Sequence, residues 1–217
     1  TFTCKTRYPP AAGTAGESGG TMMETPGVLK VHDTEFNVLR LLGHGKGGYS
    51  WLVSRDGKEY VIKQIHHEPC TYYTFGNKIE AELRDFHRLK EAGIAIPVML
   101  DVDMQRERIL KEYIPGPTVY DLVAAGQLPP VCTEQIRRLS CQARNAGLNL
   151  DWFPTNFIWH QNRLYYVDYE CNDFMEEWSL ENWGIRYWTR TPEFLQDLNR
   201  RRQLPDTGAQ AASPDPD

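Results

Sequence analysis

The pattern of apolar and polar residues in the first half of the chain predicts a series of β-strands. Residues 35–43 (EFNVLRLLG), 49–54 (YSWLVS) and 59–65 (EYVIKQI) are strand-like segments. Asp56-Gly57 stands between the second and third of these segments, and this dipeptide is typical of the tight turn of a β-hairpin. We therefore expect antiparallel pairing in this part of the chain.

A helix is predicted next, over residues 78–92 (KIEAELRDFHRLKEA), with Gly93 placed to end it. Two further strand-like segments, PVMLDVD and RILKEYI, follow this helix and end at Pro115-Gly116. They predict a second hairpin.

The pattern changes toward helix in the second half of the chain. Thr118, with Asp121 three positions later, indicates a capped helix start, and Gly126 marks the end of that helix. Thr133 is expected to cap a longer helix that ends at Gly147. The apolar face of this longer helix is expected to carry Ile136, Leu139, Ala143 and Ala146.

The last part of the folded chain mixes a small hairpin with helix. The segments NFIW and RLYYVD predict two short strands around Gln161-Asn162, and residues 174–202 read as helical. Thr191 followed by Pro192 is typical of a helix start. The many aromatic residues between 174 and 194 are expected to pack in the core, with an exposed interface as the alternative.

This order of elements predicts an α+β fold of two lobes with a cleft between them. The N-terminal lobe, an antiparallel sheet plus one helix, is expected over residues 29–113, and a reduced helical C-terminal lobe over 114–202. Residues 1–28 and 203–217 have little to bury and are expected to be disordered tails.

Composition excludes several classes of function. The formal net charge of -5 disfavours a general nucleic-acid binder, and no apolar run is long enough to span a membrane. The start of the chain shows no basic segment followed by an apolar one, so no secretory signal is expected. The five cysteines are odd in number, widely spaced and form no C-x-x-C pair, which suits a reducing compartment, so we expect a cytoplasmic protein. The six histidines show no metal-ligand spacing.

Gly43, Gly45 and Gly48 form the pattern G-x-G-x-x-G, which is a weak signal when it stands alone. In a dinucleotide-binding fold these glycines would open a helix after a strand. Here a strand follows instead, so the order favours a glycine-rich turn between two antiparallel strands, where bare backbone approaches phosphate oxygens closely.

Lys63 lies among apolar residues on the strand 59–65, where a lysine commonly covers its stem and extends its ammonium into water. At about 100° per residue, Glu82 falls at about 300° on the helix, inside the apolar stripe that starts from Ile79 at 0°, whereas Glu80 falls at about 100°. A carboxylate on that stripe is costly unless it is paired. Lys63 is therefore the predicted partner of Glu82, and a position of Glu82 at the rim of the helix face is the alternative.

Asp151, Pro154 and Asn156 give the pattern D-x-x-P-x-N, and Asp168 follows the second short strand. Phosphoryl transfer needs metal ions to neutralise the phosphate oxygens and a carboxylate to orient the attacking hydroxyl. Asn156 and Asp168 offer the hard oxygen ligands that Mg²⁺ prefers, and Asp151 would face the acceptor. Taken singly, Asp151 could cap a turn and Asn156 could tolerate an unusual backbone angle.

The ordered set of glycines, lysine, helix glutamate, D-x-x-P-x-N and Asp168 resembles the protein-kinase-like superfamily across roughly residues 36–190. The likeness is greatest to small atypical kinases, namely the RIO family, the tRNA-modification-associated kinases, and the choline and aminoglycoside kinases. The resemblance implies a bilobal fold with a minimal C-terminal lobe and no long activation segment. It also implies ATP and Mg²⁺ as cofactors.

The resemblance implies a role for each matching residue. Asp151 would be the catalytic base, with Asn156 and Asp168 as magnesium ligands. Lys63 and Glu82 would form the ion pair that holds the phosphates, beneath the lid made by Gly43, Gly45 and Gly48. The segment ILKEYIPG resembles the hinge, where the backbone around Glu112 and Tyr113 would meet the adenine.

Two triplets depart from the pattern of regulated protein kinases. His-Arg-Asp is replaced by Asn149-Leu150-Asp151, so the arginine that pairs with a phosphorylated activation loop is missing. Asp-Phe-Gly is replaced by Asp168-Tyr169-Glu170, a form that choline-kinase-like proteins often carry. These departures favour a small atypical kinase.

The leading hypothesis is an ATP- and Mg²⁺-dependent phosphotransferase that acts on a hydroxyl of a protein (Ser/Thr) or a small molecule. The alternative is a pseudokinase-like module that holds nucleotide, or nothing, and acts through partners. An acidic stretch with Asp173, Glu176, Glu177 and Glu181 would suit a cationic substrate, although an ordinary charged surface explains it better.

Overall fold

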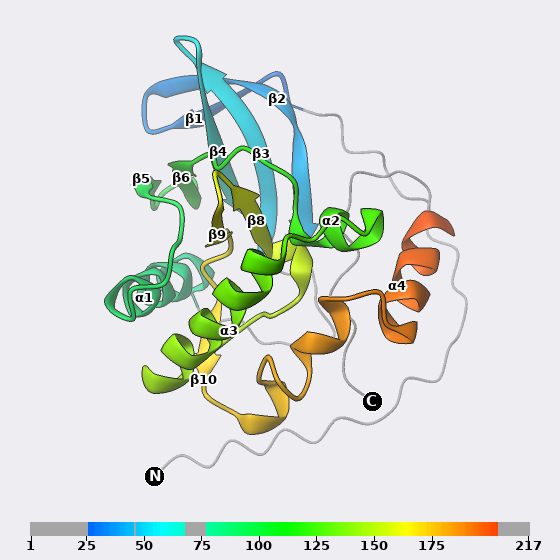
Figure 1. Cartoon of the computed structure of the whole chain (residues 1–217). Coiled ribbons are helices and arrows are strands. Elements are labelled where there is room, and N and C mark those ends of the chain that lie inside the picture. The colour runs from blue at the N-terminus through cyan, green and yellow to red at the C-terminus, as the bar shows by residue number, and fades with distance from the viewer. Residues whose placement is uncertain (1–25, 46, 68–76, 204–217) are drawn as a thin grey trace, which may run out of the picture.

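The computed structural model describes residues 26–45, 47–67 and 77–203 of the chain (Figure 1). The predicted disordered tails lie outside the described residues except at their inner ends. There, Val28 begins the first strand and Gln203 ends the last helix, so these two residues belong to the fold.

Six antiparallel strands form one sheet in the order β1-β2-β3-β4-β6-β5. Their bounds are β1 Val28–Val31, β2 Thr34–Gly45, β3 Gly48–Arg55, β4 Lys58–Ile65, β5 Met99–Asp103 and β6 Arg108–Glu112. Asp56 and Gly57 both have positive φ, 51° and 74°, as the predicted tight turn between β3 and β4 requires. Both predicted hairpins are therefore confirmed, whereas the short strand β1 was not predicted.

The two faces of the sheet carry different residues because neighbouring side chains on a strand point to opposite sides. One face holds a compact apolar group that we call the outer-face cluster: Leu29, Val31, Phe36, Trp51, Val53, Ile62 and Leu110. The opposite face, called the inner face here, packs Ile65 and Ile109 against Ile79 and Leu89 of α1 (Lys78–Glu91).

Helix α1 begins and ends close to the predicted positions. The side chain of Asn77 accepts a hydrogen bond from the backbone N–H of Glu80 and caps the first turn. Gly93 follows the C-cap with φ of 71°, the left-handed conformation that glycine adopts most easily.

Helix α2 (Val119–Ala125) has the predicted capping box, with reciprocal hydrogen bonds between Thr118 and Asp121. The next helix, α3 (Pro130–Asn145), starts earlier than predicted, so Thr133 lies inside it and does not cap it. The helix begins at Pro130 because proline has the backbone angle of a first turn and no N–H to leave unbonded there.

The remainder consists of short elements and one final helix. The elements are β7 Leu148–Leu150, η1 Pro154–Asn156, β8 Phe157–His160, β9 Arg163–Tyr166, β10 Cys171–Asp173, η2 Glu176–Trp178, η3 Gly184–Tyr187 and α4 Pro192–Gln203. The strands β8 and β9 form the predicted hairpin, and β7 pairs with β10. Thr191 accepts a hydrogen bond from the N–H of Phe194 and caps α4 as predicted.

The prediction of continuous helix over 174–202 was wrong for its first part, which contains only the two short turns η2 and η3. The physical reason is the way this segment wraps Trp152. A Cβ added at Gly184 would lie 2.4 Å from the Cβ of Trp152, so the chain must pass directly over that indole. Such close wrapping favours irregular backbone over a regular helix.

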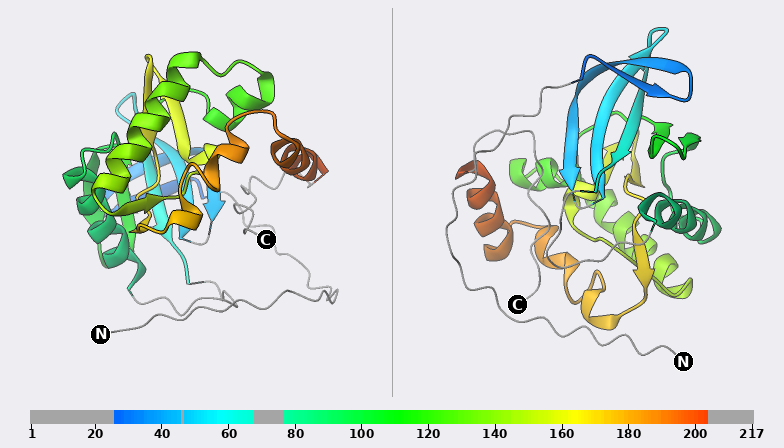
Figure 2. Two further views of the ribbon diagram at one scale, coloured as in Figure 1. Left: turned by 60° about the horizontal axis from the view of Figure 1, so that its bottom comes forward. Right: turned by 180° about the vertical axis from the view of Figure 1, so that it is seen from behind.

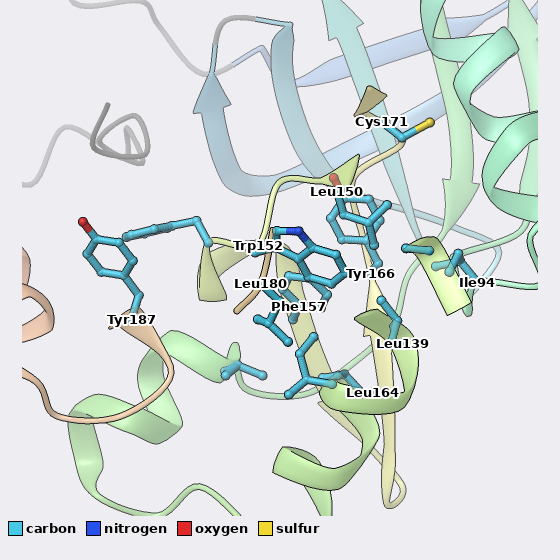
Figure 3. Close-up of a cluster of buried hydrophobic side chains, with 14 of the residues drawn as sticks. Ile94, Leu139, Leu150, Trp152, Phe157, Leu164, Tyr166, Cys171, Leu180 and Tyr187 are labelled. Atoms are coloured by element: carbon cyan, nitrogen blue, oxygen red, sulfur yellow. The ribbon is translucent and has the colours of Figure 1, made fainter. Parts of the chain in front are cut away.

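A large apolar core joins the inner face of the sheet and α1 to the second half of the chain. Figure 3 shows Trp152, Phe157 and Tyr166 at its centre, and the rings of Trp152 and Phe157 stack at 6.2 Å. Trp183, Tyr187, Trp188 and Phe194 are all buried in this core. The expected core packing of these aromatic residues is therefore confirmed.

Figures 1 and 2 show the sheet at one end of the molecule and the helices α2, α3 and α4 toward the other, with the β8–β9 hairpin between them. The helices α1 and α4 lie on opposite sides in every view. The predicted α+β class is confirmed. The division into two kinase-like lobes at residues 113 and 114 stays a prediction.

Candidate active site

Lys63 on β4 connects three distant parts of the chain. Its Nζ donates a hydrogen bond to Glu82 Oε1 on α1, 19 positions away, and to Asp168 Oδ1, 105 positions away and at 3.0 Å. The side chains of Lys63, Glu82 and Asp168 are 8%, 11% and 28% exposed. The group is thus largely enclosed but reachable at the carboxylate of Asp168.

The local folding of β4 and α1 explains the pair between Lys63 and Glu82. Alternation on β4 turns Lys63 to the inner face, and the helical spacing of α1 turns Glu82 toward the same face while Glu80 is exposed. The two alternatives from the sequence, a lysine that reaches into water and a glutamate at the rim, therefore do not apply. Glu82 Oε2 is also buried, with no hydrogen-bond partner among the described residues.

Electrostatics keeps Lys63 and Asp168 charged. Burial by itself would lower the pKa of Lys63, but the charges of Asp168 and Glu82 outweigh burial and raise it. Burial would likewise raise the pKa of Asp168, yet the charges of Lys63 and Lys111 hold it below its usual range. A charged carboxylate at the edge of an enclosed site is suited to bind a cation.

The turn between β2 and β3 lies over the ion pair at Gly47, a glycine that the predicted set of Gly43, Gly45 and Gly48 did not include. Gly43 and Gly45 are on β2 and Gly48 begins β3, and Lys46 falls outside the described residues. A Cβ added at Gly47 would lie 3.3 Å from Lys63 Nζ and 3.4 Å from Glu82 Oε1. Only a residue without a side chain leaves this space open above Lys63.

Gly48 is required for a different reason. A Cβ at this position would lie 2.2 Å from the backbone oxygen of Gln64 on β4, which no side chain could tolerate. Gly48 therefore lets the tip of the β2–β3 hairpin approach β4 closely. The chain here forms a strand, a glycine-rich turn and a second strand, and no helix follows the turn.

Asp151 stands at the end of β7, in a turn that its own side chain stabilises. Asp151 Oδ1 accepts a hydrogen bond from the N–H of Phe153 at 3.0 Å, and Asn156 Nδ2 donates to the backbone oxygen of Asp151 at 3.4 Å. Pro154 starts the single turn η1 that brings Asn156 back toward Asp151. The pattern D-x-x-P-x-N thus folds into one compact loop.

This loop is tied to the segment that carries Asp168. The backbone N–H of Val167 donates to the backbone oxygen of Asn156 at 2.9 Å, so Asn156 and Asp168 are held on adjacent segments. The structure gives no direct side-chain contact between Asn156 and Asp168. It brings together Lys63, Glu82 and Asp168 through side chains, and Asp151, Asn156 and Asp168 through backbone.

The oxygen ligands available at this site suit a magnesium ion better than a metal whose ligands all come from protein side chains. Within the described ranges, no three His, Cys, Asp or Glu side chains are grouped to hold a metal ion. Mg²⁺ commonly takes one or two protein oxygens and completes its coordination with phosphate and water. The partly exposed carboxylate of Asp168 and the amide of Asn156 fit that requirement.

Tyr166 is a site residue that the sequence analysis missed. Its hydroxyl accepts a hydrogen bond from the N–H of Asp151 at 3.3 Å and donates to the backbone oxygen of Glu170 at 2.7 Å. It therefore bridges the Asp151 loop and the Asp168 segment from inside the core. The sequence carries no specific signal for this role, because Tyr166 is one of two adjacent tyrosines in the strand RLYY.

The predicted hinge residues Glu112 and Tyr113 lie at the end of β6. The backbone N–H of Glu112 donates to the oxygen of Val98 at 2.9 Å, and the Glu112 side chain accepts from the N–H of Val98 at 3.1 Å. Beyond them, a Cβ at Gly116 would lie 2.4 Å from the backbone oxygen of Trp159, so this connection packs closely on β8. Neither residue contacts the Lys63 group in the interactions that the structure shows.

Other features of the surface do not add to the site. Arg88 pairs with Asp173, and Arg144 pairs with Glu176 and Glu181, so most of the predicted acidic patch is balanced by arginines. Two open hollows lie elsewhere, one along α4 and one over the outer face of the sheet near Tyr60. None of the helices in the described part of the chain has the length and apolarity needed to cross a membrane.

Comparison with known proteins gives a similarity over about half of the chain. The chain is 28% identical over 110 residues to the KEOPS complex subunit Bud32 of Pyrococcus abyssi, and the match covers 48% of each protein. The chain therefore matches about half the length of this relative. No family model matches the chain. The similarity is consistent with the kinase-like superfamily that the motifs indicate.

Proposed function

We propose that the protein is a small kinase-like phosphotransferase that uses ATP and Mg²⁺ to phosphorylate a hydroxyl group. One observation carries the proposal: Lys63 Nζ is bonded to both Glu82 and Asp168, which come from distant parts of the chain. A buried lysine held by two carboxylates beneath a glycine turn is an arrangement that receives phosphate. The similarity to Bud32 over half the chain supports the same class.

In this proposal, the residues around Lys63 bind the nucleotide. The ammonium of Lys63 would meet the phosphates, and Glu82 would hold that ammonium in place. The backbone of the turn at Gly43, Gly45 and Gly48 would cover the phosphates. The backbone at Glu112 and Tyr113 would meet the adenine.

Asn156 and Asp168 would hold the magnesium ion, and Asp151 would act on the acceptor. The ion, when bound, would supply positive charge to the phosphate oxygens during transfer. Asp151 would orient the attacking hydroxyl and accept its proton, for which a carboxylate at the end of a stabilised turn is suited. The acceptor would be a serine or threonine of a protein, or a small molecule.

Transfer of labelled γ-phosphate from ATP, to water or to the protein itself, tests these roles. Asp151→Asn is expected to lower the transfer by at least about 100-fold, the lower end for loss of a general base. Asp168→Asn is expected to lower the transfer as well, because it removes a proposed magnesium ligand. Asp173→Asn is the matched control, because Asp173 is 93% exposed and lies outside the proposed site. Equal residual transfer in the wild type and in all three variants would defeat the assignment.

A second candidate is a nucleotide-binding module that acts through a partner. It is favoured by the altered triplets around Asp151 and Asp168, and the relative Bud32 is named as a subunit of a complex. Thermal unfolding with ATP separates the two candidates. Stabilisation that requires Mg²⁺ supports the enzyme, whereas stabilisation without Mg²⁺ and without transfer supports the module.

A further inference from the structure

Lys111 is a second buried lysine on the inner face of the sheet, and the proposed chemistry gives it no role. It lies on β6 opposite Val61 of β4, and only 5% of its surface is exposed. Lys63 pairs with Ile109, two residues before Lys111, so the two lysines are diagonal neighbours on one face. A buried ammonium is costly unless its contacts compensate for the loss of water.

The contacts of Lys111 are with the residues directly before and after Asp168. Lys111 Nζ donates to the backbone oxygen of Val167 at 2.8 Å and lies 4.6 Å from the centre of the Tyr169 ring. A cation over an aromatic face is attracted to it, and a hydrogen bond from a charged donor is stronger than a neutral one. Lys111 thus contacts the residues on both sides of Asp168 in the chain, the backbone of Val167 and the ring of Tyr169.

Tyr169 is itself held in place by other contacts, so its ring offers Lys111 a fixed surface. The hydroxyl of Tyr169 donates to the backbone oxygen of Pro97 at 2.9 Å, and its ring packs edge-on against Phe86 of α1 at 5.0 Å. The segment around Asp168 is therefore anchored to α1, to the start of β5 and, through Lys111, to β6.

The burial of Lys111 is costly. Burial lowers its pKa to about 8 and the charge of Lys63 adds to this effect, whereas Asp168 and Glu82 oppose it. A methionine would fill the same space without this cost, so packing alone does not explain a lysine here.

We propose that Lys111 is a positioning residue that fixes the carboxylate of Asp168 in the orientation that receives the magnesium ion. Lys111 acts through the backbone oxygen of Val167 and the ring of Tyr169. The identity of the ion rests on the proposed function. The contacts by which Lys111 holds the segment around Asp168, which we call the clamp, do not. Loss of a group that orients a metal ligand typically weakens metal binding by about 10- to 100-fold.

The first test compares Lys111→Met with Lys78→Met. Lys78 is an equally buried lysine whose Nζ donates to a backbone oxygen, that of His66 at 2.7 Å, so it controls for the loss of a buried ammonium. Thermal unfolding is followed while Mg²⁺ is titrated at a saturating concentration of a non-hydrolysable ATP analogue. In Lys111→Met, the Mg²⁺ concentration for half-maximal stabilisation is expected to rise by about 10- to 100-fold.

Metal-free binding of the same analogue shows whether the effect is one of positioning. It is expected to stay unchanged in Lys111→Met, because Lys63 and the glycine turn are intact. Lys111→Arg keeps the donor and the cation and is expected to restore most of the Mg²⁺ response. Equal loss of metal-free and metal-dependent binding, or no change in the Mg²⁺ requirement, would overturn the proposal.

A second readout needs no ligand. Hydrogen exchange of the backbone amides from Val167 to Cys171 is expected to be at least about tenfold faster in Lys111→Met, as loss of a charged hydrogen bond predicts, and unchanged in Lys78→Met. If the wild type binds no nucleotide, the proposed function fails and this exchange alone decides whether the clamp exists. If Lys111→Met does not fold, Lys111→Gln takes its place in both measurements.

Discussion

On β4, Ile62 and Lys63 are neighbours in the chain and point to opposite faces of the same sheet. Ile62 is fully buried in the outer-face cluster, where every member is apolar. Lys63 is almost as deeply buried on the inner face, where it meets two carboxylates. The same contrast holds on β6 between Leu110 and Lys111.

The contrast teaches that burial on the two faces has different consequences. On the outer face, burial removes apolar surface from water and stabilises the fold directly. On the inner face, each buried charge is stable only while its partners remain. Substitutions on the outer face should therefore change stability without changing ligand binding. Substitutions on the inner face should change both.

The largest effect is expected from Lys63→Met, which leaves the carboxylates of Glu82 and Asp168 without their shared cation. Breaking a buried ion pair from one side typically costs about 3–5 kcal/mol. Urea denaturation should show this loss, and stabilisation by ATP should disappear. Adding Glu82→Gln should restore part of the free energy of unfolding but none of the response to ATP. A Lys63→Met variant as stable as the wild type would remove the distinction between the faces.

Ile62→Ala is expected to cost about 2–4 kcal/mol, because it opens a cavity in the outer-face cluster. In contrast to Lys63→Met, it should leave the relative stabilisation by ATP and Mg²⁺ unchanged at a temperature where the variant is folded. The measurement is urea denaturation followed by titration with ATP. Loss of the ATP response in this variant would show that the outer face also shapes the site.

Tyr166→Phe is expected to cost about 1 kcal/mol, because the partly buried backbone N–H of Asp151 and backbone oxygen of Glu170 lose their hydroxyl partner. Phosphate transfer should fall through kcat, with KM for ATP unchanged, since the hydroxyl touches only the catalytic segments. Tyr165→Phe is the matched control, because this neighbour on β9 points to the other side of the hairpin. A change in KM alone would contradict the bridging role.

The smallest effect concerns Asp103, a buried carboxylate on β5 that is not part of the Lys63 group. Burial alone would raise its pKa, but hydrogen bonds from Arg106 and from the N–H of His32 lower it to about 2. Because the folded pKa is lowered, Asp103 stabilises the fold at neutral pH, and this contribution is lost as the pH falls from about 4 toward 2. Thermal unfolding across that range should show a steeper loss in the wild type than in Asp103→Asn. Parallel curves would contradict this assignment.

The sequence predicted those parts of the fold that depend on neighbouring residues. The turn at Asp56-Gly57, the capping box of Thr118 and the orientation of Glu82 follow from local geometry, and the structure contains all three. The strand β10 was missed because its three residues gain their place only by pairing with β7, which is distant in sequence. Thr133 was predicted to cap α3, but the helix begins at Pro130, where the fixed backbone angle of proline suits the first turn.

The candidate site was predicted in part for the same reason. Lys63, Asp151 and Asp168 stand out in sequence because a charged residue interrupts an apolar segment. Lys111 has the same signature within RILKEYI, since alternation places it beside Ile109 on the inner face, but the segment was read as a hinge. Tyr166 has no such signal, because its hydroxyl acquires partners only when β9 enters the core.

Helix α1 makes polar contacts on three successive turns, and this sets a limit on how the chain can change length. Glu82 meets Lys63 on the sheet, Asp85 accepts from the N–H of Cys171 at 3.5 Å, and Arg88 pairs with Asp173 at 2.5 Å. One inserted residue would rotate everything after it by about 100° and break the contacts that follow. The turn at Gly57, where an added Cβ would meet nothing, imposes no such limit. Natural or engineered length variation should therefore accumulate at that turn and be absent from α1.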